Sequence, residues 1–188
     1  MNLWAGEFGN AYLARNRVNW RARMPLWKRV LDVTKPRSVL EVGCNAGWNL
    51  MALRALDRNL SLVGIDVNDA ALVEANEAGL DAEHVEARDA ACLGTFDLVL
   101  TAGLLIHIPP SDLPAVMGAI AAASSRWVVA VEYASEVEEE VNYRGMAGAL
   151  WRRPFGAMYE ALGLALVETI PADKTEGFDD CQLWVLRK

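Results

Sequence analysis

Short apolar runs alternate with stretches of helical periodicity along the middle of the chain. The apolar runs cover residues 38–42, 61–65, 84–86, 98–101 and 127–132. Helical spacing of apolar residues separates them, at residues 48–56, 69–77 and 112–123. Buried strands that alternate with helices are typical of a parallel sheet in which each helix returns the chain to the next strand. The pattern therefore predicts an α/β fold.

The pattern changes after residue 133. An acidic run at 136–140 is followed by helical periodicity over 145–162 and by strand-like runs at 164–170 and 182–186. A polar loop joins the last two runs, which predicts a hairpin that closes one edge of the sheet. We therefore expect one seven-stranded, mostly parallel sheet with an antiparallel last strand and helices on both faces.

The first 35 residues are rich in aromatic side chains: Trp4, Phe8, Tyr12, Trp20 and Trp27. Their spacing predicts helices that pack on the sheet, and the alternative is a lid over a ligand. We expect residues 1–35 to form a helical lid and substrate arm. Residues 36–188 are expected to form a single domain, with an insertion at about 134–160 that contributes to its pocket.

Composition narrows the class of protein. The 188 residues are 53% hydrophobic and 23% charged, which suits one domain with a hydrophobic core. Acidic residues outnumber basic ones by 25 to 18, and the formal charge of −7 disfavours nucleic acid as a partner. Because no run reaches about 18 uncharged apolar residues, we expect no membrane association. The arginine-bearing N-terminus does not fit a secretory signal, so the expected location is the cytoplasm.

Cysteine and histidine usage argues against disulfide and metal sites. Cys44, Cys92 and Cys181 are odd in number and far apart, with no C-x-x-C pair. Only His84 and His107 could add imidazole ligands. We therefore expect neither a disulfide framework nor a metal cluster.

A glycine-bearing turn follows the first predicted strand, at residues 39–47. Gly43 and Gly47 permit a sharp backbone turn and close approach of a ligand at the carboxyl end of the strand. Asp66 ends the second predicted strand, where an acidic side chain can accept hydrogen bonds from ribose hydroxyls. The combination predicts an adenosine-binding site.

Details of the turn discriminate between adenosine ligands. A dinucleotide site requires G-x-G-x-x-G, but here Asn45 takes the place of the second glycine and the third is missing. Glu41 would repel a pyrophosphate, whereas it could help to hold a ligand that carries an ammonium and a sulfonium. These features disfavour NAD and FAD and favour S-adenosylmethionine.

Four segments between residues 41 and 100 resemble the motifs of a known family. The string E-V-G-C-N-A-G at residues 41–47 resembles motif I of the class I S-adenosylmethionine-dependent methyltransferases. Asp66 matches the acid that ends their second strand, Asp89 matches the acid near the adenine amino group, and residues 96–100 resemble their fourth strand. The resemblance implies a Rossmann-like fold, S-adenosylmethionine as methyl donor and S-adenosylhomocysteine as product.

A closer resemblance is to methylases associated with pseudaminic acid biosynthesis. This label implies a small polar metabolite as the methyl acceptor. The resemblance rests on segments throughout the chain: residues 4–10, Tyr12, Arg15 and Asn16, Asn45 and Asn49, residues 103–108, and residues 142–145.

Two sets of binding residues are expected from these positions and from the resemblance. The cofactor set is Tyr12, Arg15, Glu41, Gly43, Cys44, Asn45, Gly47, Asn49, Asp66, Val67, Asp89, Ala90, Thr101 and Ala102. The acceptor set is Trp4, Phe8, Glu132, Tyr133, Tyr143 and Arg144. Arg144 could clamp an anionic acceptor, whereas Arg152 and Arg153 are expected on a solvated helix face.

His107 is the candidate catalytic residue. It follows the fourth predicted strand on the ligand edge, and an imidazole suits removal of a proton from an acceptor hydroxyl. The alternative is a histidine packed among its apolar neighbours in residues 104–108. His84 is expected away from the binding edge, as a structural or exposed residue.

The sequence thus predicts an S-adenosylmethionine-dependent methyltransferase that acts on a small polar metabolite by O- or N-methylation, with sugar or natural-product biosynthesis as the candidate context. Two alternatives stay open: a nicotinamide-dependent oxidoreductase on a similar fold, and a non-catalytic S-adenosylmethionine-binding subunit. The expected partner is a small-molecule acceptor, and an anionic one is allowed. The chain is expected to be a monomer or homodimer.

Overall fold

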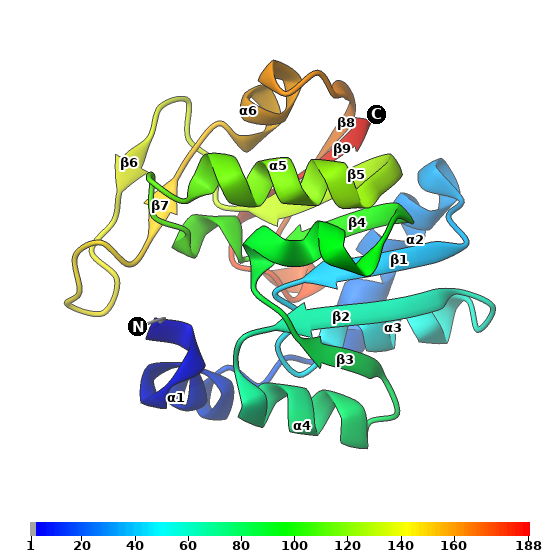
Figure 1. Ribbon diagram of the computed structural model, residues 1–188, viewed down its shortest axis with the longest axis horizontal. Helices are drawn as coiled ribbons and strands as arrows, with labels where there is room; N and C mark the ends of the chain where they lie inside the picture. Colours follow the sequence, from blue (N-terminus) through cyan, green and yellow to red (C-terminus); the bar gives the residue numbers. More distant parts are fainter. Residues whose placement is uncertain (1–2) are drawn as a thin grey trace.

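A computed structural model describes residues 3–188, and its centre is one seven-stranded sheet (Figure 1). The strand order is β3-β2-β1-β4-β5-β9-β8, in which β9 runs antiparallel to both of its neighbours and the other pairs are parallel. The strands are β1 (Ser38–Val42), β2 (Ser61–Asp66), β3 (Asp81–His84), β4 (Phe96–Ala102), β5 (Ser124–Glu132), β8 (Ala165–Ala172) and β9 (Cys181–Arg187). The predicted α/β fold with an antiparallel last strand is confirmed.

Helices cover both faces of the sheet. One face carries α2 (Met24–Thr34), α3 (Trp48–Leu56) and α4 (Asp69–Glu77), and the other carries α5 (Leu113–Ala123), α6 (Phe155–Ala161) and the 3₁₀ segment η3 (Ala87–Leu93). Side chains of β4 alternate between the two cores, because Leu98 and Leu100 join the first and Val99 joins the second. The central strands are therefore apolar on both faces, as expected for a covered parallel sheet.

The strand order reverses between β1 and β4. From β1 the chain builds outward to β2 and β3, and it then crosses back to add β4 and β5 on the other side. Such a reversal opens a crevice at the carboxyl ends of the two strands, which is where ligands bind in open α/β sheets.

The N-terminal arm divides into two parts. Its first part comprises η1 (Leu3–Ala5) and α1 (Glu7–Arg15), which lies beside α4 near the carboxyl edge of the sheet (Figure 1). The second part comprises η2 (Trp20–Arg23) and α2, whose Leu26, Trp27 and Val30 are fully buried in the core. The helices that the sequence predicts in the arm are present. Those before residue 16 do not join the two main cores, but Leu13 of α1 is buried in a small cluster with Ala46 and Ala71.

The helix predicted over residues 145–162 is wrong in its first half. Residues 133–154 instead form an extended loop, which we call the insertion, with the two-stranded pair β6 (Glu139–Glu140) and β7 (Trp151–Arg152). Positive φ angles at Gly145 (81°) and Gly148 (69°) are incompatible with a helix, and Pro154 directly precedes α6.

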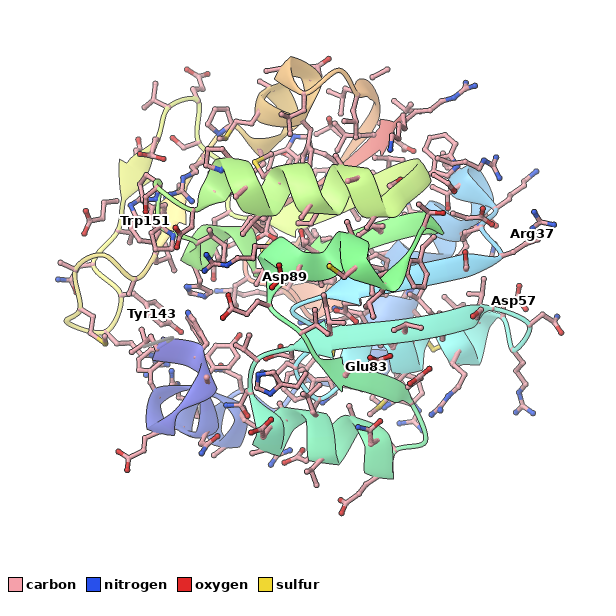
Figure 2. All side chains as sticks on the ribbon, in the orientation of Figure 1. Arg37, Asp57, Glu83, Asp89, Tyr143 and Trp151 are labelled. Carbon is pink, nitrogen blue, oxygen red and sulfur yellow. The ribbon has the colours of Figure 1, made fainter. Side chains whose placement is uncertain are left out.

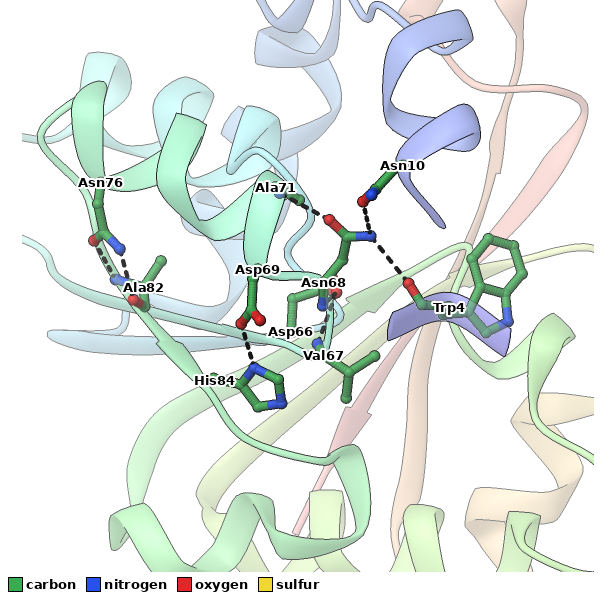
Figure 3. A network of polar contacts seen from close by, with 10 residues as sticks. All are labelled: Trp4, Asn10, Asp66, Val67, Asn68, Asp69, Ala71, Asn76, Ala82 and His84. Atoms are coloured by element: carbon green, nitrogen blue, oxygen red, sulfur yellow. Dashed lines mark hydrogen bonds and ion pairs between the residues drawn. The ribbon is translucent and has the colours of Figure 1, made fainter. Parts of the chain in front are cut away.

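The third strand begins earlier than predicted. The side chain of Asn76 pairs with both backbone groups of Ala82, at 2.9 and 3.1 Å, and this draws residues 81–84 into the sheet (Figure 3). His84 therefore ends β3 at the carboxyl edge of the sheet, not away from it. Its Nδ1 lies 2.6 Å from Asp69 Oδ1, and its side chain is half exposed. No helix within residues 3–188 is long and apolar enough to cross a bilayer.

Candidate functional site

A cavity of about 640 Å³ opens at the carboxyl edge of the sheet, between the turn after β1 and the ends of β2 and β4. The arm and the insertion complete its walls. The predicted site residues that line it are Trp4, Tyr12, Glu41, Gly43, Cys44, Asn45, Asn49, Asp66, Val67, Ala102 and His107. The structure therefore brings the main predicted cofactor residues and the candidate base to one site.

The turn after β1 requires left-handed backbone at three positions. The φ angles are 76° at Gly43, 49° at Asn45 and 76° at Gly47. A Cβ at Gly43 would lie 2.9 Å from Leu104 Cδ1, and one at Gly47 would lie 2.1 Å from Leu80 Cδ1. Asparagine tolerates the left-handed region better than most residues, which explains how Asn45 can replace a glycine there.

Asp66 is fixed by backbone donors on both sides. Its Oδ2 accepts from Asn45 N at 2.8 Å, and its Oδ1 accepts from Val67 N at 2.8 Å and from Asn68 N at 2.9 Å. Burial raises the pKa of this carboxyl, and the backbone donors partly offset the shift. A carboxylate has about four acceptor positions, so a hydroxyl of a ligand can still be accepted.

A buried glutamate and a half-buried arginine lie on either side of Asn49 in the lining of the cavity. Glu41 Oε1 accepts from Asn49 Nδ2 at 2.6 Å, and Glu41 Oε2 has no hydrogen-bond partner within residues 3–188. Asn49 Oδ1 accepts from Arg23 Nη1 at 2.9 Å and from Trp27 Nε1 at 3.1 Å. Burial raises the pKa of Glu41 to about 8.

Arg23 was not among the predicted site residues. Its Nε and Nη2 donate to Gly177 O at 3.1 and 3.0 Å, and its guanidinium lies 4.2 Å from the ring centroid of Phe178. None of the ion pairs formed within residues 3–188 involves Arg23. A half-buried cation that lines a cavity with only neutral hydrogen-bond partners is a ready site for an anionic ligand group.

His107 ends the short 3₁₀ turn η4 (Leu105–His107). Its Nδ1 lies 2.7 Å from the carbonyl oxygen of Ala149, and because a carbonyl only accepts, Nδ1 carries the proton. Nε2 is then the unprotonated nitrogen. Burial lowers the pKa of His107 to about 4, so the ring is neutral at pH 7 and can accept a proton.

Aromatic rings from the arm and the insertion surround His107. The ring centroid of Trp4 lies 4.3 Å from that of His107, and the ring of Tyr143 lies 5.3 Å from it. Phe8 bridges the two segments, at 5.0 Å from Trp4 and 6.4 Å from Tyr143. Figure 2 shows Tyr143 and Trp151 on the insertion at the left of the view, with Tyr143 just above α1. These rings can limit access of water to His107.

Asn68 docks the arm on the sheet edge (Figure 3). Its Nδ2 donates to Trp4 O at 3.0 Å and to Asn10 Oδ1 at 2.9 Å, while its Oδ1 accepts from Ala71 N as the N-cap of α4. Gly9 allows this approach, because a Cβ there would lie 1.9 Å from Trp4 O. Asn68 was not among the predicted site residues, because its role depends on contacts from the distant arm.

Two residues have different surroundings from those expected. Glu132 does not line the cavity, because it is fully buried and accepts from Thr101 Oγ1 at 2.9 Å and from backbone N–H groups of the η4 turn. Arg153 is not on a solvated helix face: it is 0% exposed and its Nη1 donates to the carbonyl oxygens of Leu105 and Ile108, each at 3.0 Å. Both residues hold the turn that carries His107.

Other predicted site residues lie outside the lining of the cavity. Arg15 lies over the rings of Phe8 and Tyr12. Asp89 is exposed on η3 (Figure 2), whereas residues 85–88, directly before it, line the cavity. The remaining predicted residues that do not line it are Phe8, Gly47, Ala90, Thr101, Tyr133, Tyr143 and Arg144. Lining residues that were not predicted include Arg23, Trp48, Asn68, Leu104, Ile108 and Ala149.

Comparison of whole structures defines the class of fold. Magnesium protoporphyrin IX methyltransferase from Synechocystis PCC 6803, solved with bound S-adenosylmethionine, superposes with a TM-score of 0.72 at 14% identity, over 99% of this chain and 93% of that chain. A Burkholderia thailandensis 1,6-didemethyltoxoflavin-N1-methyltransferase gives a TM-score of 0.70 at 14% identity, over 96% and 82%. A glycopeptide N-methyltransferase gives 0.69 at 10% identity, over 97% and 98%. The fold is the Rossmann-like fold of these methyltransferases.

Sequence comparison agrees with this class. Residues 39–125 match the family model described as a methyltransferase domain, and the matched segment contains the turn after β1, Asp66 and His107. A search of curated proteins gave no significant match to the chain.

Proposed function

We propose that this protein is an S-adenosylmethionine-dependent methyltransferase that acts on a small polar metabolite. The observation that carries the proposal is the pair formed by Arg23 and Glu41, which Asn49 bridges at the edge of the cavity. The methionine part of the cofactor carries a carboxylate and an ammonium. The guanidinium and the free oxygen of Glu41 can pair with these two groups. A pyrophosphate, in contrast, carries no cationic group that could pair with Glu41.

The rest of the cofactor fits the remaining lining. Asp66 is proposed to accept from the ribose hydroxyls, and the tight turn at Gly43 and Gly47 allows the ligand to approach the backbone. We assign the adenine end to residues 85–88, Ile108 and Val116, which line the cavity between η3 and α5. This assignment replaces a direct contact by the exposed Asp89.

The chain's own residues would contribute positioning and proton transfer. Bound S-adenosylmethionine supplies a methyl group on a sulfonium, which is open to in-line displacement. His107 Nε2 is proposed to take the proton of the acceptor as the new bond forms, since the ring is neutral and Nδ1 is held by Ala149 O. Trp4 and Tyr143 would exclude water and orient the acceptor.

The acceptor class is proposed from the resemblance to methylases associated with pseudaminic acid biosynthesis and from the small cavity. O- or N-methylation of a sugar-like or natural-product-like metabolite fits a neutral imidazole and aromatic walls. Arg144 lies exposed beside Tyr143, at 5.9 Å from its ring, and it remains a proposed contact for an anionic acceptor. We propose a monomer or a homodimer.

Two measurements test this function. Calorimetry should show micromolar binding of S-adenosylhomocysteine and no binding of NAD, and the reverse result would favour a nicotinamide-dependent oxidoreductase. Mass spectrometry with isotopically labelled S-adenosylmethionine should then find methyl transfer in a screen of polar metabolites. Binding without transfer to any acceptor would instead favour a non-catalytic cofactor-binding subunit.

A further inference from the structure

Two buried charged side chains hold opposite ends of the turn that carries His107. On one side, Glu132 Oε1 accepts from the N–H groups of Leu104 and Leu105, at 3.2 and 3.1 Å, and Oε2 accepts from Ile106 N at 3.3 Å. On the other side, Arg153 Nη1 donates to the carbonyl oxygens of Leu105 and Ile108. Both side chains are 0% exposed.

This arrangement matches the polarity of the turn. The N–H groups at the start of a helical turn carry partial positive charge, and the carbonyl groups at its end carry partial negative charge. A carboxylate at the first end and a guanidinium at the second therefore stabilise the turn. A 3₁₀ turn as short as Leu105–His107 has little stability of its own, so its conformation depends on such outside contacts.

The insertion supplies the contacts at the second end. Arg153 and Ala149 both belong to it, and Ala149 O accepts from the His107 ring. Within the insertion, Arg153 Nε donates to Glu138 Oε2 at 2.7 Å, and its guanidinium lies 4.9 Å from the ring centroid of Trp151. The ring of His107 and the backbone on either side of it, at Leu105 and Ile108, are thus contacted by one segment. This segment also lines the cavity through Gly148 and Ala149.

We propose that Arg153 is a positioning residue for His107, through which the insertion fixes the backbone of the η4 turn and directs Nε2 toward the reacting methyl group. Arg153 contacts neither cofactor nor acceptor in this role. Its fork geometry allows one side chain to bind two carbonyl groups and Glu138 together, which a lysine cannot reproduce. The proposal rests on the proposed methyltransferase function for its catalytic consequence.

The test compares Arg153→Lys with Arg152→Lys, an adjacent arginine whose side chain is exposed. The chain has only two histidines, so long-range ¹H–¹⁵N spectra of the ring nitrogens can follow His107, and His84→Gln assigns the signals. In Arg153→Lys we expect a shift of the His107 Nδ1 and Nε2 signals and an upward move of the His107 pKa from about 4 toward its ordinary value of 6.5. The Arg152→Lys spectrum should match the wild type.

Kinetic and binding readouts separate positioning from a general structural role. At saturating cofactor, kcat of Arg153→Lys should fall by about 100-fold, as expected for a misplacement near 1 Å, while the Kd for S-adenosylhomocysteine stays within about twofold. Unchanged histidine signals and unchanged kcat in folded Arg153→Lys would overturn the proposal. So would a kcat loss that is matched by an equal loss of cofactor affinity, since that pattern indicates general disruption.

A second variant covers the case in which Arg153→Lys does not fold. Glu138→Gln keeps the guanidinium and removes the charge of its half-exposed partner, and it should shift the His107 signals in the same direction by a smaller amount. Unshifted His107 signals in that variant would count against the proposal. If the wild type binds no S-adenosylhomocysteine, the proposed function fails, but the histidine spectra still decide whether Arg153 orders the turn.

Discussion

The indole of Trp4 lies against the imidazole of His107, with 4.3 Å between ring centroids, although Trp4 belongs to η1 and His107 follows β4. The carbonyl of Trp4 is held by Asn68, whose own N–H is bound by Asp66. A continuous set of contacts therefore links the proposed ribose site to the proposed base. Binding of a ligand at Asp66 and placement of the arm over His107 should favour each other.

Substitution of Asn68 tests this link. Asn68→Asp keeps an acceptor for the N-cap of α4 but removes both donors to the arm, so α1 should dock less firmly. We expect proteolysis within residues 3–17 to speed up and S-adenosylhomocysteine binding to weaken by about fivefold, which corresponds to ~1 kcal/mol. Ala70→Asp, at an exposed position of the same helix, is the control for a new charge on α4. Equal proteolysis rates in Asn68→Asp and wild type would remove the docking role.

Removal of the Arg23 charge should weaken binding of the amino-acid part of the cofactor. For Arg23→Gln we expect the Kd for S-adenosylhomocysteine to rise by at least about tenfold, because hydrogen bonds to charged groups contribute about 1.5–3 kcal/mol. Arg21→Gln is the matched control, because Arg21 is an exposed arginine of the same segment that lies over the ring of Trp20 and does not line the cavity.

A second ligand makes the Arg23 experiment specific. Methylthioadenosine retains adenine and ribose but has no amino-acid part, so Arg23→Gln should bind it as the wild type does. An equal loss of affinity for both ligands would show that Arg23 supports the fold of the site and does not bind a carboxylate.

The local features of the site could be predicted from sequence, whereas its charged supports could not. The turn at Gly43 and the strand-end acid Asp66 are encoded within a few neighbouring residues, so their placement needs only the alternation of strands and helices. Arg153 shows the opposite case. Next to Arg152 it resembles a pair of surface charges, and only contacts with Leu105, Ile108 and Glu138 make its burial favourable.

The fold shows the same division. The strands of the main sheet and the antiparallel last strand followed from the hydrophobic pattern, because the central strands are buried on both faces. The insertion was misread as helix since its apolar spacing is helical while Gly145 and Gly148 adopt backbone angles that a helix excludes. The start of β3 depends on hydrogen bonds from the side chain of Asn76, and the pattern of apolar and polar residues contains no information on such bonds.

Replacement of His107 should affect turnover and leave cofactor binding intact. His107→Asn removes the proton acceptor at Nε2, and general-base contributions are typically about 10²- to 10⁴-fold, so we expect kcat to fall by at least about 100-fold. Calorimetry with S-adenosylhomocysteine should give the wild-type Kd. Wild-type turnover in His107→Asn would show that His107 is not the base and only packs against Trp4 and Tyr143.

Asp66→Ala should weaken cofactor binding by at least about 1.5 kcal/mol if the carboxylate accepts from the ribose. The variant also leaves three backbone N–H groups without their acceptor, so thermal unfolding must be measured beside binding. Asp69→Ala, whose carboxylate bonds His84 at the same edge, is the control. Cofactor affinity equal to the wild type at a temperature where Asp66→Ala is folded would exclude the ribose contact.

Protonation of Glu41 gives a pH dependence with a defined sign. Burial raises the pKa of Glu41 from 4.5 to about 8, so the folded protein holds this proton where the unfolded chain has lost it. The resulting stability is fully present below about pH 4.5 and is lost as pH rises toward 8. For His107 the sign is opposite: its contribution to stability grows as pH rises from about 4 to its ordinary pKa of 6.5. Glu132, whose pKa is raised to about 7, loses stability with rising pH as Glu41 does. Thermal stability of the free protein should therefore fall from about pH 6.5 to 8.

Binding of the cofactor should release the Glu41 proton, because the ligand ammonium favours the ionised carboxylate. At pH 6.5, calorimetry with S-adenosylhomocysteine in two buffers of different ionisation enthalpy should show release of close to one proton, and affinity should increase with pH up to about 8. Glu41→Gln should abolish the release, and methylthioadenosine, which has no ammonium, should release none from the wild type. Equal proton release by both ligands would place the titrating group elsewhere in the cavity and remove Glu41 from the ammonium site.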